Sequence, residues 1–362
     1  MITDDVVGQL AAVVKSLAVD RVFVLVDENT AECCLPILRH ETRDTRHETR
    51  DTRHETGDVD VFDKVKVIKI KAGDEIKTIE TAVEVWNELV DNGATRSSLL
   101  VNVGGGVVTD LGGFVAATFK RGMRFVNVPT TLLGVVDAAT GGKTGVNFRG
   151  LKNEIGAFAS PEKVLINPQF FETLDFKNKL SGYAEMVKHA LIADSILLEQ
   201  TLAYDLDEFD GSRLSLLLKQ NLDIKETIVE FDPHEKGQRK ALNFGHTVGH
   251  AFESLSYELG KPMLHGFAVM WGMVAELYLS FIKLRFDKDV LMRIVAFAKE
   301  YYGAFPYSCK EYEQLYDLMK HDKKNSGDEI NFTLLAGVGD VRINQIVIKE
   351  EVFEALDFIR EN

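Results

Sequence analysis

The stretch Leu99-Leu-Val-Asn-Val-Gly-Gly-Gly-Val-Val-Thr-Asp110 decides the fold class of this chain. Its first five residues have the apolar, β-rich character of a buried parallel strand. Three glycines follow at once, and a helical pattern begins at Asp110 and continues to residue 120. Glycines in a strand–helix turn permit positive φ and remove side chains, so backbone N–H groups can face a phosphate. The stretch therefore predicts a phosphate-binding turn, although the usual Gly-x-Gly-x-x-Gly fingerprint is missing.

Predicted strands and helices alternate on both sides of this turn. Residues 21–26, 65–70 and 125–128 predict strands, and residues 76–89 predict a helix. Such alternation indicates a layered α/β domain with parallel strands.

The pattern changes near Leu180, after which β-branched runs become rare. Long helical patterns occupy residues 183–198, 213–230, 248–258 and 267–284. We therefore expect a Rossmann-like α/β domain over residues 1–179, followed by a mainly α-helical domain over residues 180–362.

The chain has 362 residues, of which 45% are hydrophobic and 27% are charged, as in an ordinary globular protein. A formal net charge of -14 argues against a nucleic-acid partner, because phosphate backbones need a basic surface. The N-terminus has no signal pattern, and no apolar run reaches the roughly 18 residues of a membrane span. Cys33, Cys34 and Cys309 are too few and too badly spaced for a disulfide framework. We expect a cytoplasmic protein with no membrane partner.

Residues 39–56 fit neither domain. Arg39-His-Glu-Thr-Arg-Asp-Thr45 recurs as residues 46–52 and begins a third time at Arg53. Because the repeat contains no apolar residue, it cannot form a coiled-coil seam. Its arginines are balanced by acids, which predicts a solvated surface insert, either a salt-bridged helix or a loop. Its histidines are a weak compositional hint of metal binding.

Gly141-Gly-Lys-Thr144 looks like a Walker-type loop but fails as one. Asp137 replaces the upstream glycine, and no predicted strand leads into it. Lys143, with Lys152-Asn153, is better explained as cationic and amide groups for an anionic ligand; a plain solvated loop is the alternative. Asp27, which ends the first predicted strand, could hold a ribose hydroxyl or cap the next helix.

His246 and His250 lie four residues apart, so on a helix both project from one face. From the residues alone both are candidate metal ligands, although the adjacent glutamate of a zincin is missing. Asn243 is expected on the same polar face. Upstream residues add an acid and two cations that suit recognition of a carboxylate or phosphate: Glu235, Arg239 and Lys225.

These motifs together resemble one protein family over residues 22–339. In the first half the matching segments are Gly104-Gly-Gly-Val-Val-Thr-Asp-Leu-Gly-Gly113, Val128-Pro-Thr-Thr-Leu-Leu133, Asp137 and Gly141-Gly-Lys-Thr144. In the second half they are Ala184-Glu-Met-Val-Lys188, Glu235-Lys-Gly-Gln-Arg239, Asn243-Phe-Gly-His-Thr-Val-Gly-His250 and Leu264-His-Gly266. In this order they closely resemble the 3-dehydroquinate synthases.

The resemblance implies a carbon–oxygen lyase that acts on an anionic sugar phosphate, DAHP, in the second step of the shikimate pathway. It implies catalytic NAD+ and one divalent metal, Zn2+ or Co2+. The implied reaction proceeds by transient oxidation by NAD+, phosphate elimination, re-reduction, ring opening and aldol closure to 3-dehydroquinate. It also implies a homodimer. The alternatives are another sugar-phosphate cyclase, a metal-dependent polyol dehydrogenase of the same fold, or a non-catalytic NAD-binding protein.

The resemblance also assigns roles to individual residues. The implied metal ligands are Glu185, His246 and His265, and the implied catalytic residues are Lys188, Glu235, Arg239 and His250. The implied NAD+ contacts are Asp27, Asn29, Asp74, Lys77, Gly105, Gly106, Val107, Asp110, Thr130, Thr131, Lys143, Lys152, Thr173 and Leu174. The implied substrate contacts are Asp137, Lys143, Asn153, Lys188, Lys225, Arg239, Asn243, His250, Lys323 and, from a neighbouring subunit, Arg121.

Two positions depart from the family pattern. Phe267 follows His265-Gly266 where glutamate is frequent, and Asp74 stands where a glutamate, one methylene longer, is usual. Neither departure removes an implied metal ligand or cation.

Replacing residues 39–56 by a few Gly/Ser residues should leave activity and metal content unchanged. The segment has no apolar residue to bury, so the free energy of unfolding should shift by roughly 1 kcal/mol or less through loop entropy. Steady-state kinetics and denaturant unfolding check this. A large rise in the KM for NAD+ would show instead that the insert supports the cofactor site.

Overall fold

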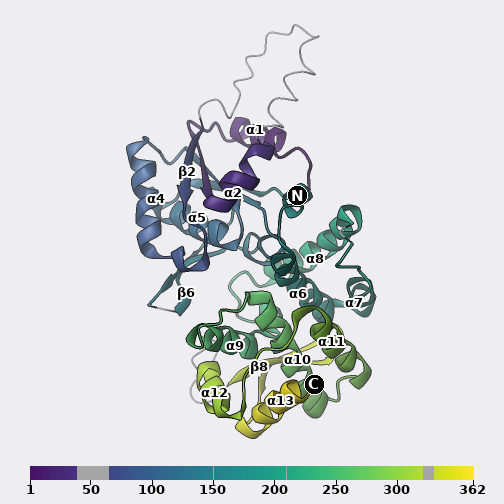
Figure 1. Cartoon of the computed structure of the whole chain (residues 1–362). Helices are drawn as coiled ribbons and strands as arrows, with labels where there is room; N and C mark the ends of the chain where they lie inside the picture. Colours follow the sequence, from purple (N-terminus) through teal and green to yellow (C-terminus); the bar gives the residue numbers. More distant parts are fainter. Residues whose placement is uncertain (39–64, 150, 209, 321–329) are drawn as a thin grey trace. The chain divides into compact units, whose positions relative to one another are not determined.

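The chain forms two compact units, Met1–Asp175 and Phe176–Asn362 (Figure 1). The computed structural model describes residues 1–38, 65–149, 151–208, 210–320 and 330–362. The repeat at residues 39–56 and the predicted substrate contact Lys323 lie outside the described residues.

The first unit is built on a parallel sheet with the strand order β2-β1-β3-β4-β7. Its strands are β1 (Val22–Asp27), β2 (Lys66–Ile70), β3 (Leu99–Gly104), β4 (Arg124–Pro129) and the short β7 (Lys163–Val164). From β1 the chain goes first to one neighbour and then to the other, so the order reverses between β1 and β3. In open sheets of this kind, ligands bind beside that point at the carboxyl ends of the strands.

Helices cover both faces of this sheet, as its continuous apolar strands predict. The helices are α1 (Val6–Ser16) and α2 (Glu28–Cys33) on one face, and α4 (Ile79–Asp91) and α5 (Gly106–Thr118) on the other. Alternate residues of β1 face opposite cores: Phe23 and Leu25 pack on the α4 and α5 side, whereas Val24 and Val26 pack on the α1 and α2 side.

An antiparallel hairpin of β5 (Lys143–Phe148) and β6 (Leu151–Phe158) follows the π-helix η4 (Gly134–Ala138). The alternative that Lys143, Lys152 and Asn153 lie in a plain loop is wrong, because all three lie on these strands. Glycine and polar residues hide the strand pattern here. Val146 and Ile155 anchor the hairpin in the apolar core on the α4 and α5 side.

The second unit is mainly helical and is organised around α10 (His265–Leu284), which contacts α6, α9, α11, α13 and β8. The other helices are α6 (Phe176–Ala193), α7 (Ser195–Leu202), α8 (Gly211–Phe231), α9 (His246–Glu258), α11 (Lys288–Tyr302), α12 (Tyr312–Lys320) and α13 (Lys349–Glu361). The expected fold class, a parallel α/β half followed by a mainly helical half, is confirmed. The proposed boundary at Leu180 lies inside α6.

Two elements of the second unit differ from the sequence-based expectation. The single helix expected over residues 183–198 is broken, because the Asp194 carboxylate accepts a hydrogen bond from Leu197 N at 2.9 Å and starts α7. An unpredicted antiparallel hairpin, β8 (Asn331–Gly337) and β9 (Asp340–Ile346), packs on α10.

Among the described residues, α10 is the one helix with the length and apolar character of a membrane span, with a mean hydropathy of 1.5. Glu276 interrupts this helix, so no uninterrupted apolar run of about 18 residues is present in it. In the most apolar 18-residue stretch of α10, 67% of the residues are buried inside the protein, as in the core helix of a folded domain.

Candidate metal centre and nucleotide-binding edge

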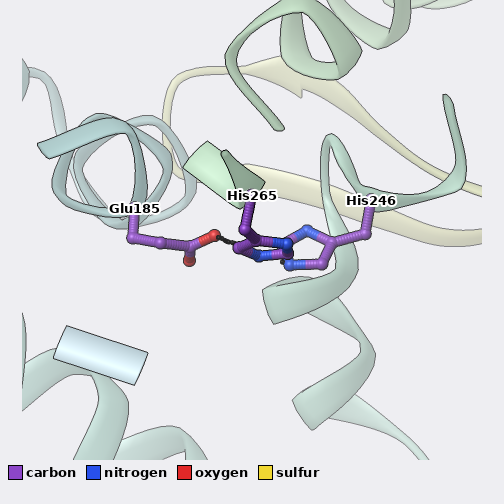
Figure 2. Close-up of side chains that lie close together, drawn as sticks. All are labelled: Glu185, His246 and His265. Carbon is purple, nitrogen blue, oxygen red and sulfur yellow. Dashed lines mark ion pairs between the residues drawn. The ribbon is translucent and has the colours of Figure 1, made fainter. Parts of the chain in front are cut away.

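Three side chains of the second unit converge from three helices (Figure 2). Glu185 lies in the middle of α6, and His246 and His265 are the first residues of α9 and α10. Glu185 Oε1 lies 3.6 Å from Nε2 of His246 and 3.6 Å from Nε2 of His265. One ligand atom from each residue lies within 4.8 Å of the others. The structure thus brings together the residues that the resemblance implies as metal ligands.

The second nitrogen of each imidazole has a partner that orients the ring. His246 Nδ1 lies 3.1 Å from the carbonyl oxygen of Phe244, and His265 Nδ1 lies 3.5 Å from Glu253 Oε2. When Nδ1 donates to these acceptors, Nε2 keeps its lone pair toward Glu185. Metal-binding histidines typically use their other N–H in this way. A carboxylate with two neutral imidazoles fits Zn2+ or Co2+ and leaves a coordination position for substrate.

His250 lies beside this cluster, also on α9. Its ring centroid is 5.2 Å from that of His246 and 5.9 Å from that of His265. With Glu253 and His265 it forms a second group of possible ligands that shares His265 with the first group. Asn243 was expected on the same helix face, and this is wrong: it ends the 3-10 helix η6 (Gln238–Asn243), before α9 begins.

Burial and charge set the protonation of two of these histidines when no metal is bound. Burial lowers the pKa of His246 well below its usual value, and the Lys188 ammonium lowers it further. Burial also opposes the charge on His265, but hydrogen bonds to Glu185 and Glu253 and their negative charges raise its pKa to about 10. Near neutral pH the metal-free site therefore holds a neutral His246 and a protonated His265.

The predicted substrate-side cations of the second unit are buried. Lys188 on α6 is 1% exposed and forms an ion pair with Glu185 Oε2. Lys225 on α8 and Arg239 on η6 are each 3% exposed, and η6 packs against both α6 and α8. Within the same segment, Asn243 Nδ2 donates to Glu235 Oε1 at 2.6 Å. Buried charges are screened little by water, so this positive group suits an anionic ligand.

In the first unit, the glycine turn lies at the carboxyl end of β3, as predicted. The turn does not use the positive φ that glycine permits: Gly105 has a φ of -72°, and neither Gly104 nor Gly106 is among the described residues with positive φ. The missing side chain is what the turn requires, because a Cβ on Gly104 would lie 2.5 Å from Val108 Cβ. Gly105 precedes α5 and has no side chain to cap it, so the start of this helix suits a phosphate.

Asp27 ends β1 and caps α2, since its Oδ1 accepts from Thr30 N at 2.8 Å. Of the two roles that the sequence left open, the helix cap is therefore present. A carboxylate has further acceptor sites, so the cap does not prevent a contact with a ribose hydroxyl.

A polar network joins the ends of β2 and the first turns of α5 to the β5–β6 hairpin. Lys77 Nζ donates to Asp110 Oδ2 at 2.6 Å, and Lys152 Nζ lies 3.3 Å from Asp74 Oδ2. Asn147 N donates to the Lys77 carbonyl oxygen at 2.7 Å. Four of the implied NAD+ contacts are thus linked in two ion pairs at one edge of the unit.

The other predicted residues of the first unit are more scattered. Those near the glycine turn are Val107 on α5, Thr130 and Thr131 after β4, and Asp137 in η4. The exposed ones on other segments are Asn29 on α2, Lys143 and Asn153 on the hairpin, and Arg121, which has a φ of 67°. Thr173 and Leu174 hydrogen-bond to the Phe170 and Phe171 carbonyls, within the turn that ends the short helix η5 (Pro168–Phe171).

Two residues of these sites were missed by the sequence analysis. Glu253 orients His265, and it stands three residues after His250 on α9, so helical spacing could have revealed it. Asn147 connects Lys77 to the hairpin, and its amide oxygen accepts from Asn153 N at 3.0 Å. No local signal pointed to Asn147, because the hairpin itself was not predicted.

Substituting the two histidines of α9 separately should distinguish a ligand from a neighbour. His246→Ala should lose both bound metal and turnover, because it removes one of the three implied ligands. His250→Ala should keep the metal and lose turnover. Elemental analysis of the purified variants measures this. If His250→Ala lost the metal while His265→Ala retained it, the ligand assignment would be wrong.

Binding of Zn2+ should release about one proton near neutral pH. The pKa of His265 is raised to about 10, so its proton stabilises the metal-free site below that pH and is lost as the pH rises through it. Metal affinity should therefore increase with pH up to that value. Calorimetric titrations in buffers of different ionisation enthalpy measure the proton release. Glu253→Gln is the matched variant: it removes one charge beside His265 and so lowers the pKa of this imidazole, and its proton release should begin to fall at a lower pH than in the wild type. The same pH dependence of proton release in both proteins would contradict the assignment.

Family models and curated relatives agree on the family of this chain. The model of the 3-dehydroquinate synthase N-terminal domain matches residues 67–181, and that of the C-terminal domain matches residues 182–325. A 3-dehydroquinate synthase of Parabacteroides distasonis is 49% identical over 362 residues, covering 100% of this chain and 98% of the relative. One from Pyrococcus abyssi is 40% identical over 297 residues, covering 81% of this chain and 85% of the relative.

Solved structures share the fold. The 2-epi-5-epi-valiolone synthase ValA from Streptomyces hygroscopicus subsp. jinggangensis, with NAD+ and Zn2+ bound, has a TM-score of 0.84 at 24% identity, covering 100% of this chain and 96% of its own. A 2-deoxy-scyllo-inosose synthase complexed with carbaglucose-6-phosphate, NAD+ and Co2+ has a TM-score of 0.82 at 20% identity, with the same coverage. At these identities the likeness concerns the fold alone. Because both family models match and the identity to curated relatives extends along the whole chain, this chain belongs to the 3-dehydroquinate synthase family.

Proposed function

We propose that this chain converts DAHP into 3-dehydroquinate and phosphate, as a carbon–oxygen lyase of the shikimate pathway. The observation that carries this proposal is the identity to a curated 3-dehydroquinate synthase along the whole chain. The buried carboxylate–imidazole cluster and the glycine turn are the two kinds of site that such a reaction needs. The roles of individual residues are part of the same proposal.

Glu185, His246 and His265 would hold a divalent cation, and the carboxyl edge of the parallel sheet would hold NAD+. When bound, the cation would polarise a substrate hydroxyl, and NAD+ would accept a hydride and later return it. The Phe244 carbonyl and Glu253 keep both Nε2 atoms directed toward the cation. His250, next to the cluster, is the titratable group that we assign to holding and moving a proton on the substrate side.

Lys188, Lys225 and Arg239 would clamp the carboxylate and phosphate of the substrate. Their burial is the support for this role, because little water would screen their charges from an anion. The planar guanidinium of Arg239 suits a bidentate contact with a carboxylate. Asn243 would add an amide, and Glu235 orients that amide through its hydrogen bond. Such a clamp lowers the barrier by holding one substrate through successive reactive geometries.

The implied NAD+ contacts of the first unit divide by chemistry. Gly105, Gly106 and the start of α5 would face the pyrophosphate, since backbone N–H groups at a helix start favour anions. Asp74 and Asp110 would accept hydrogen bonds from hydroxyl groups of the cofactor. Their ion pairs with Lys152 and Lys77 hold these carboxylates in position.

The proposal includes a homodimer in the cytoplasm. Arg121 is exposed at the turn after α5, so its side chain would be available to a neighbouring subunit. Lys323 would complete the phosphate pocket. Cys33 and Cys309 are exposed free thiols, which suit a reducing compartment.

Release of inorganic phosphate from DAHP tests the proposed function. With NAD+ and Zn2+ present, the chain should release one phosphate per DAHP. NADH, followed by its absorbance, should not accumulate, because the hydride is returned. Net NADH formation would indicate a polyol dehydrogenase. No phosphate release from DAHP by a metal-loaded chain would indicate a cyclase for another substrate.

Arg239→Lys should reduce kcat/KM for DAHP. The loss should correspond to about 1.5–3 kcal/mol of transition-state stabilisation, because a bidentate charged contact is lost while the charge remains. The matched control is Arg342→Lys, the same exchange at an exposed ion pair with Asp340, which should leave kcat/KM unchanged. Steady-state kinetics of the two variants decide the matter. Near-normal kinetics in Arg239→Lys would place this guanidinium away from the substrate.

A further inference from the structure

The start of α9, which carries His246, cannot be capped by its own first residue. The N-cap position is Gly245, which has a φ of 80° and no side chain. The first N–H groups of a helix have no acceptor within the helix. A Ser, Thr, Asn or Asp side chain usually accepts them at the N-cap. In α9 the acceptor must come from another element.

Glu276, in the middle of α10, supplies this acceptor. Its Oε2 accepts from Gly245 N at 2.6 Å, and its Oε1 accepts from Thr247 N at 3.1 Å and Val248 N at 3.4 Å. The side chain is completely buried, at 0% exposure. A buried carboxylate is costly unless it is hydrogen-bonded, and its negative charge also complements the positive end of the helix dipole. The contact with α9 therefore explains why an acid stands in this apolar helix.

The backbones of α9 and α10 come very close at the same place. A Cβ on Gly272 of α10 would collide with the carbonyl oxygen of Gly245 and with Gly249 N. This close approach lets the Glu276 carboxylate reach the first turn of α9. His265 is the first residue of the same helix α10. One rigid helix thus presents one imidazole and holds the turn that carries the other.

We propose that Glu276 is a positioning residue for the metal site. By capping α9 from α10, it fixes the backbone of His246, and thereby the spacing of the His246 and His265 imidazoles, before a cation binds. The inference rests on the proposed function only in taking Glu185, His246 and His265 as the ligands. Glu276 acts through the backbone of residues 245–248 and belongs to neither group of possible ligand atoms.

Binding of Co2+ to the full-length Glu276→Gln variant tests the proposal. Glutamine keeps the size of the side chain but loses the charge and replaces one acceptor by a donor, which would face a backbone N–H. The dissociation constant for Co2+ should rise about 10–100-fold, the usual effect of losing an outer partner of a metal ligand. The visible absorption of bound Co2+, which reports ligand geometry, should shift as well.

The matched control is Ser280→Ala, one turn further along α10. The Ser280 hydroxyl is also buried, donates to the Glu276 carbonyl oxygen at 2.6 Å and accepts from Leu335 N at 2.9 Å, but it does not take part in the α9 cap. This variant should lose thermal stability while keeping the wild-type Co2+ affinity and spectrum. If Glu276→Gln behaved like Ser280→Ala, its role would be merely structural and the proposal would be overturned.

Hydrogen exchange of the wild-type chain provides a test that does not depend on a variant folding. The amides of Gly245, Thr247 and Val248 should already be protected without metal, and Co2+ should change their exchange little. Protection that arises only with Co2+ would show that the cation orders this turn, and would overturn the proposal. If the wild-type chain binds Co2+ and releases phosphate from DAHP, but Glu276→Gln has the wild-type Co2+ affinity, this inference alone would be contradicted. If the wild-type chain binds no Co2+, the ligand assignment on which both proposals depend would be contradicted.

Discussion

The charge of one buried carboxylate, Glu185, is the constraint on which the arrangement of the helical unit depends. Its side chain has 0% exposure, and a charge in such a place is tolerated only with partners of opposite sign. Lys188 supplies one partner from the same helix, and His265, whose pKa is raised to about 10, supplies another. A divalent cation would neutralise the carboxylate more fully while displacing the proton of His265. The starts of α9 and α10 must therefore be held within reach of α6.

A different constraint governs the first unit, where a bound phosphate would have to approach the backbone. The parallel sheet places the ends of its strands at one edge, and the turn after β3 lacks side chains. Two ion pairs, Lys77–Asp110 and Lys152–Asp74, fix polar groups beside that turn. Backbone geometry would thus provide the proposed anion site in this unit, whereas buried side-chain charges would provide the proposed site in the second unit.

Local sequence patterns predicted the strands and helices that depend mainly on residues close together in the chain. The strands at β1, β3 and β4 and the long helices of the second unit follow from periodicity, which depends on near neighbours. The β5–β6 and β8–β9 hairpins were missed, because short strands rich in glycine and polar residues depend on tertiary packing. The candidate metal site could not be predicted from local patterns for a similar reason. Helical spacing suggested His246 and His250 as a pair of ligands. In the structure His265, from another helix, lies next to His246 and Glu185. Only the family resemblance pointed to His265. Phe267 stands where the family often has glutamate, and its ring centroid lies 5.0 Å from that of Tyr302.

The position of the bound metal tests the central claim most directly. A crystal of the full chain grown with Zn2+ and measured at the zinc absorption edge would locate the ion by its anomalous signal. We predict one peak about 2.0–2.2 Å from a carboxylate oxygen of Glu185 and from Nε2 of both His246 and His265. A peak bound instead by His250, Glu253 and His265, with Glu185 still paired to Lys188, would contradict the account.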